Sequence, residues 1–235
     1  MDTGFIKNIK ETADNTLKGT MYFPLKKVVI FDFDYTLGDS SRGIILSINY
    51  ALGKMGYEKA REDKIIKTIG MSLAETYKKL TNRNNQEEIK TFEVYFKEKA
   101  DEVMVSNTCL YSGVTKLLDS LHNKGLKTAI ATTKYHYRIN QILKANNACH
   151  LVDYIAGGED VTLPKPSPEG IYKIKENFHV KPKEILYVGD SIVDAETAKA
   201  AGTDFIAVLT GVTEPKEFKK YPYVHILNHV TELVI

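Results

Sequence analysis

Five short apolar segments rich in β-branched residues recur along the chain, each followed by turn residues and a helix-like stretch. They cover residues 27–31, 127–131, 153–156, 185–188 and 204–209. Segments this apolar are typical of strands buried on both faces, as in a parallel sheet. Strands that alternate with helices pack as a doubly wound layer. The pattern therefore predicts an α/β fold with a doubly wound, mostly parallel sheet.

Residues 40–108 break this alternation and contain no convincing strand. A 3.6-residue period typical of a helix is formed by Ile44, Ile48, Ala51, Leu52 and Met55. Such an insertion after the first strand would lie over the carboxyl ends of the strands, where open α/β sheets bind ligands. We therefore expect a helical cap at 40–108, a catalytic core at 22–39 and 109–235, and an N-terminal extension at 1–21.

Composition narrows the classes of partner. The 235 residues are 43% hydrophobic and 26% charged, which suffices for a buried core without disulfides. The net charge of +2 provides no broad basic surface, so we expect a small-molecule partner and no nucleic acid. No apolar segment reaches the ~20 residues of a membrane span. Two cysteines without paired spacing favour a cytoplasmic location, and both a monomer and a homodimer stay open.

Two aspartates directly follow the first apolar segment. Asp32 and Asp34 are two residues apart, so in extended chain their side chains point to the same side. Carboxylates held close together repel each other and favour a bound cation. Hard oxygen ligands suit Mg²⁺ better than zinc, which prefers histidine or cysteine. A solvated acidic turn is the alternative explanation of this pair.

A second acidic pair follows the fourth apolar segment. Asp190 comes at the expected strand end and Asp194 one helical turn later, on the same helix face. Asp190 alone is also a good helix N-cap residue. That alternative weakens because another acidic pair ends a strand of the same sheet.

Four carboxylates at one sheet edge need a positive partner. Lys165 lies between two prolines after the third segment and can supply that charge. Thr132 follows the second segment and can donate a hydrogen bond to a phosphate oxygen. Taken singly, Lys165 is typical of a solvated surface lysine, and Thr132 is typical of a helix-capping residue.

Taken together and in order, these residues resemble the motifs of the haloacid dehalogenase superfamily of aspartate-nucleophile phosphatases. The match spans 26–212, and the motifs are similar to residues 32–36, Thr132, Lys165 and 189–194. The resemblance implies the family's Rossmann-like core with a helical-bundle cap. The phosphoglycolate phosphatase branch is most similar, through residues 39–40, 111–114, 131–134 and 165–168. The resemblance implies that phosphoryl-transfer members carry an acid where this chain has Asp34, so we expect the chain to belong to the phosphoryl-transfer side of the superfamily.

The resemblance also implies a role for each residue. Asp32 would be the nucleophile that forms an aspartyl phosphate, and Asp34 the general acid and base. Thr132 and Lys165 would hold the phosphate oxygens. Mg²⁺ would be bound by Asp32, by the backbone carbonyl of Asp34 and by Asp190. Asp194 would either bind the metal through a water or orient Lys165.

Three positions depart from the pattern of the branch. Tyr35 stands where a glycine is usual, Gly38 where an aliphatic residue is usual, and Ser112 where a proline is common. Tyr35 follows the first motif closely, so we expect it to alter the flap there or to narrow the substrate entrance.

Several alternatives remain open at this point. A β-phosphoglucomutase-like enzyme would share all the motifs, as would a pyrophosphate or nucleotide phosphatase of the superfamily. A phosphate-sensing protein on the same scaffold and a receiver domain are less consistent with the motifs and the cap. The expected substrate is a small, phosphoglycolate-like monoester. Arg42 and the turn at 70–72 are candidates to face the leaving group, but a solvated helix start and an ordinary turn explain them equally well.

Overall fold

The computed structural model describes residues 25–235, and the expected extension at 1–21 lies outside this range. A six-stranded parallel sheet has the order β5-β4-β1-β6-β7-β8. The strands are β1 (Val28–Phe31), β4 (Lys127–Ala131), β5 (Tyr154–Ala156), β6 (Ile185–Gly189), β7 (Asp204–Val208) and β8 (His225–Leu227). This confirms the predicted parallel α/β fold. The short edge strand β8 was not expected, since three residues are too few to show a period.

Alternate residues of each central strand enter two different apolar layers. In β1, Val29 and Phe31 join one buried cluster, whereas Val28 and Ile30 join the other. The first layer is completed by α6 (Val114–Asn123) and α7 (His136–Ala145). The second is completed by α8 (Glu169–Asn177), α9 (Ile192–Ala201) and α10 (Pro215–Phe218). Burial on both faces explains why the strand segments are continuously apolar.

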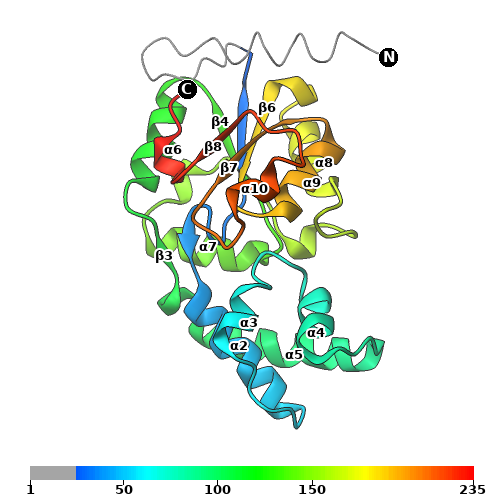
Figure 1. The fold of residues 1–235 in the computed structure, drawn as a ribbon. Coiled ribbons are helices and arrows are strands. Elements are labelled where there is room, and N and C mark those ends of the chain that lie inside the picture. The colour runs from blue at the N-terminus through cyan, green and yellow to red at the C-terminus, as the bar shows by residue number, and fades with distance from the viewer. Residues whose placement is uncertain (1–24) are drawn as a thin grey trace, which may run out of the picture.

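The segment between β2 (Gly38–Asp39) and β3 (Cys109–Leu110) is helical and has an apolar cluster of its own. Its helices are α2 (Ser41–Lys54), α3 (Glu62–Ile66), α4 (Leu73–Thr81) and α5 (Gln86–Val103). In Figure 1 they lie together below the sheet. Single 3₁₀ turns are η1 (Val105–Asn107), η2 (Cys149–Leu151), η3 (Gly158–Asp160), η4 (Pro182–Glu184) and η5 (Val230–Glu232).

The antiparallel pair β2–β3 joins the two parts of the chain. A side chain at Gly38 would place its Cβ 2.7 Å from the carbonyl oxygen of Cys109. This close approach explains why glycine replaces the aliphatic residue that the family pattern suggested. Among the described residues, no helix is both long and apolar enough to cross a membrane.

Candidate active site

Three aspartates meet at the carboxyl ends of two adjacent strands. Asp32 follows β1 and Asp190 follows β6, the strand that pairs with β1, while α9 carries Asp194. One carboxylate oxygen from each lies within 4.8 Å of the others, and all three side chains are buried. Ser191, and not Asp190, is the N-cap of α9, so capping does not explain Asp190. The structure thus brings together three of the four carboxylates predicted from the sequence.

Lys165 is the cation that faces this cluster. Its Nζ lies 2.8 Å from Oδ1 of Asp32 and 2.6 Å from Oδ1 of Asp194. The contact with Asp32 is an ion pair without hydrogen-bonding alignment, since Oδ1 of Asp32 has no hydrogen-bond partner among the described residues. Tyr187, on β6, donates its hydroxyl to the same Asp194 oxygen at 2.7 Å. These contacts hold Lys165 in place through Asp194.

The buried charges shift one another's protonation. Burial raises the pKa of Asp32 to about 7, even though Lys165 acts to lower it. Burial and the nearby Asp194 raise the pKa of Asp190 well above its ordinary value. Burial acts to lower the pKa of Lys165, but the carboxylates of Asp194 and Asp32 outweigh it and raise that pKa. One lysine therefore does not balance the negative charge of three carboxylates.

The cluster suits a divalent cation. All the available donors are carboxylate oxygens, the ligand type of Mg²⁺. Oδ1 of Asp32 is buried and has no hydrogen bond among the described residues, and its ion pair with Lys165 at 2.8 Å is the contact that balances its charge there. Oδ2 of Asp190 fits against Gly211, where an added Cβ would lie only 1.9 Å away. The residues present therefore match a hard metal ion rather than zinc.

Asp34 lies outside this three-carboxylate group. Its Oδ2 is 3.1 Å from Nζ of Lys134, and both side chains are buried. Oδ1 of Asp34 is also buried and has no hydrogen-bond partner among the described residues. Asp32 and Asp34 thus face different cations, Lys165 and Lys134, although they are only two residues apart in the chain.

Thr132 lies where the sequence predicted it, directly after β4. Its hydroxyl accepts a hydrogen bond from the backbone N–H of Lys134 at 3.2 Å. Thr132 and Lys165 line the same cavity, which has an empty volume of about 320 Å³, part of it open to solvent, and which Asp32 does not line. The two residues expected to hold a phosphate group therefore share one space.

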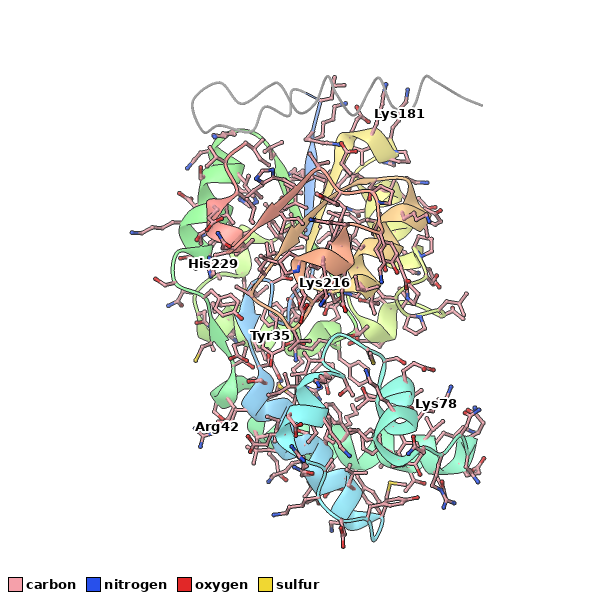
Figure 2. All side chains as sticks on the ribbon, viewed as in Figure 1. Tyr35, Arg42, Lys78, Lys181, Lys216 and His229 are labelled. Atoms are coloured by element: carbon pink, nitrogen blue, oxygen red, sulfur yellow. The ribbon has the colours of Figure 1, made fainter. Side chains whose placement is uncertain are left out.

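Tyr35 has a left-handed backbone conformation, with a φ of 59°. This region favours glycine, the residue usual at that position in the family pattern. The side chain is 9% exposed, and Figure 2 shows it near the junction of the sheet and the helical segment. Burial raises the pKa of its hydroxyl to about 12, so the group stays neutral at pH 7.

Arg42 and the turn at 70–72, the two candidates to face the leaving group, lie in different places. Gly70 has a φ of 91°, and its carbonyl accepts a hydrogen bond from Thr133 at 3.4 Å, so the 70–72 turn reaches the core beside Thr132. Arg42 is exposed, and in Figure 2 it lies on the outer side of α2, pointing away from the junction.

A sequence model of the family described as "Haloacid dehalogenase-like hydrolase" matches residues 29–208. The chain belongs to this family. It is 31% identical over 186 residues to a phosphoglycolate phosphatase from Aquifex aeolicus, covering 79% of this chain and 85% of the relative. It is 28% identical over 206 residues to the pyrophosphatase PpaX of Bacillus mycoides, covering 88% and 94%.

Solved structures agree with this assignment. A haloacid dehalogenase-like protein from Bacteroides fragilis superposes with a TM-score of 0.86 at 39% identity, over 89% of this chain and 100% of that one. The relatives of this haloacid dehalogenase-like hydrolase include phosphatases. The chain is therefore a phosphatase, and it is similar to the phosphoglycolate phosphatase branch.

The sequence analysis missed two buried polar residues of this hydrolase. Tyr187 is a tyrosine within an otherwise aliphatic strand, which is a weak signal for a hydroxyl with a polar partner. Lys134 follows Thr132 by two residues, but its contact with Asp34 joins distant parts of the chain. Only the packing of β1 beside β4 brings those two groups together.

Proposed function

We propose that this chain is a Mg²⁺-dependent phosphatase that hydrolyses a small phosphate monoester through an aspartyl phosphate on Asp32. The observation that carries the proposal is the buried group at the tips of β1 and β6. There Asp32 lies 2.8 Å from Lys165 and beside Asp190 and Asp194. A nucleophilic carboxylate, a fixed cation and spare oxygen ligands are the parts that phosphoryl transfer requires.

In the proposed reaction, a carboxylate oxygen of Asp32 attacks phosphorus and the bond to the alcohol oxygen breaks. Water then attacks the phosphorus of the aspartyl phosphate, which releases inorganic phosphate and regenerates the Asp32 carboxylate. The covalent intermediate divides one difficult displacement into two easier ones.

Asp34 is proposed to move the protons. It would donate one to the departing alcohol oxygen and then accept one from the attacking water. Its buried Oδ1 lacks a hydrogen-bond partner among the described residues, which supports this role. Its other oxygen is held by Lys134 at 3.1 Å, which fixes the direction of the carboxylate.

Thr132 and Lys165 are proposed to bind the phosphate oxygens, whose charge must be stabilised throughout the transfer. Asp32, Asp190 and the backbone carbonyl of Asp34 would hold Mg²⁺, which offsets the repulsion between the carboxylate and the phosphate. The 2.6 Å contact of Asp194 with Lys165 favours the orienting role among the two that the sequence left open.

The domain division is part of the same proposal. Residues 40–108 would form a cap that covers a core made of 22–39 and 109–235, and exclude water during transfer. A cytoplasmic location stays a prediction from the sequence. Phosphoglycolate and pyrophosphate, after which relatives are named, are the reference substrates.

The proposal is tested by phosphate release from these two compounds. Asp32→Asn should reduce turnover by roughly 10³-fold or more while the fold is retained. EDTA should abolish the activity of the unaltered protein, and added Mg²⁺ should restore it. Asp63→Asn, at an exposed carboxylate, is the matched control and should leave turnover unchanged. Substantial turnover by Asp32→Asn would reject the nucleophile, and turnover in EDTA would reject the metal.

A further inference from the structure

A cleft between the helical segment and the core residues that follow β4 begins beside Asp34. Its empty volume is about 540 Å³, part of which is open to solvent. Asp34 lines the cleft, so a group that leaves from phosphate beside this residue enters it. Most of the apolar lining comes from the helical segment, through Ile44, Ile48, Ile69, Met71, Leu73 and Phe96.

The cations in this cleft are already paired. Of the residues described as lining it, Lys134 and Arg138 carry positive charge. Lys134 is 3.1 Å from Asp34, and Arg138 is 2.5 Å from Asp101, which lies on α5. Both cationic side chains are almost fully buried, at 4% and 3% exposure. Each cation already contacts a carboxyl group, Lys134 that of Asp34 and Arg138 that of Asp101, so neither is left without a polar partner for a second anionic group.

One buried donor does remain. Nε of Arg138 has no hydrogen-bond partner among the described residues. A neutral acceptor oxygen would satisfy it without adding charge. A carboxylate would also have to compete with Asp101, which accepts a hydrogen bond from Nη2 of the same guanidinium.

These features set the chemistry of the leaving group. Burying a carboxylate or a second phosphate without a counter-charge is costly, whereas apolar surface is stabilised by the lining. Given the proposed phosphatase activity, on which this inference rests, we propose that the substrate is the phosphate monoester of an uncharged alcohol with an apolar body. That body fills the cleft, and at most one acceptor oxygen meets Arg138. Neither phosphoglycolate nor pyrophosphate has this form.

A homologous series of alkyl phosphates tests the proposal. Ethyl, butyl and hexyl phosphate have the same reacting group and differ only in apolar length. We expect kcat/KM to rise about fourfold for each methylene that enters the cleft, equivalent to ~0.8 kcal/mol. Phosphoglycolate and pyrophosphate should fall at least roughly tenfold below hexyl phosphate. A flat series, or a preference for phosphoglycolate, would overturn the proposal.

A charge placed in the cleft gives a second test. Met71→Lys adds a cation to the lining, so the ratio of phosphoglycolate to hexyl phosphate kcat/KM should rise at least roughly tenfold. Val94→Lys adds the same charge on α5, at a side chain that is 64% exposed and outside the cleft, and should leave the ratio unchanged. An equal effect of both variants would contradict the assignment of the cleft.

Acetyl phosphate separates the two proposals, because its small acyl group makes little use of the cleft. If acetyl phosphate is hydrolysed in an Asp32-dependent reaction while the alkyl series is flat, the leaving-group inference fails and the phosphatase proposal stands. If none of these compounds is hydrolysed, both fail.

Discussion

At the scale of single residues, Tyr35 shows how one position can carry a backbone cost. Its φ of 59° lies in the left-handed region, which costs an L-residue roughly 1–2 kcal/mol. The surrounding turn keeps it there: its N–H donates to the carbonyl of Gly38, and its own carbonyl accepts from the hydroxyl of Thr210. The tyrosine therefore occupies a conformation that favours glycine, close after Asp32 in the chain, and hydrogen bonds on both sides hold it there.

Two substitutions isolate that backbone cost. Tyr35→Gly and Tyr35→Ala both remove the buried ring, but only alanine keeps the unfavourable left-handed conformation. We expect the glycine variant to have the larger free energy of unfolding, by about 1 kcal/mol, in urea denaturation. Outside the left-handed region the order would be reversed, so an alanine variant of equal or greater stability would contradict the backbone assignment.

At the scale of elements, a polar contact joins the helical segment to the core. Arg138, on α7, donates to Asp101, on α5, and the hydroxyl of Tyr137 donates to the same carboxylate oxygen. The guanidinium also lies against the rings of Tyr135 and Tyr137. Because Arg138 is buried, its charge depends on Asp101 for compensation.

Removing that compensation should weaken the junction. Asp101→Asn leaves the guanidinium of Arg138 with a neutral partner, so we expect the free energy of unfolding to fall by about 1–2 kcal/mol in urea denaturation. Glu102→Gln is the matched control, because Glu102 is exposed and, within residues 25–235, forms an ion pair only with Lys99 on the same helix. The control should change stability by less than about 0.5 kcal/mol. Equal effects of the two variants would show that the junction does not depend on this ion pair.

At the scale of the whole molecule, the buried carboxyl group of Asp32 makes the free energy of unfolding depend on pH. Burial raises the pKa of Asp32 from 3.8 to about 7. Between these values the folded protein binds more protons at this site than the unfolded chain. The free energy of unfolding therefore falls as the pH rises through this window.

The unfavourable charge can be removed by substitution. In EDTA at pH 8, Asp32→Asn should be more stable than the unaltered protein, by on the order of 2 kcal/mol. The difference should shrink towards pH 4, where Asp32 is protonated in the folded state. Thermal unfolding across this pH range measures it, with Asp63→Asn as the exposed control. An Asp32→Asn variant that is no more stable at pH 8 would contradict the raised pKa.

The sequence by itself determined the alternation of strands and helices, the helical insertion and the residues at the strand tips. Hydrophobic period is a property of neighbouring residues, and burial on both faces makes each strand segment uniformly apolar. The carboxyl ends of parallel strands converge at one edge, so Asp32 and Asp190 were predicted to meet without knowledge of the strand order.

Only the tertiary structure decided how those residues divide their contacts. Asp32 faces Lys165, whereas Asp34, two residues later, faces Lys134. Tyr187 reaches Asp194 across the strand–helix connection. The cleft beside Asp34 depends on how the helical segment packs over the core. Such contacts join residues that are distant in the chain, so they follow from packing and not from any local period.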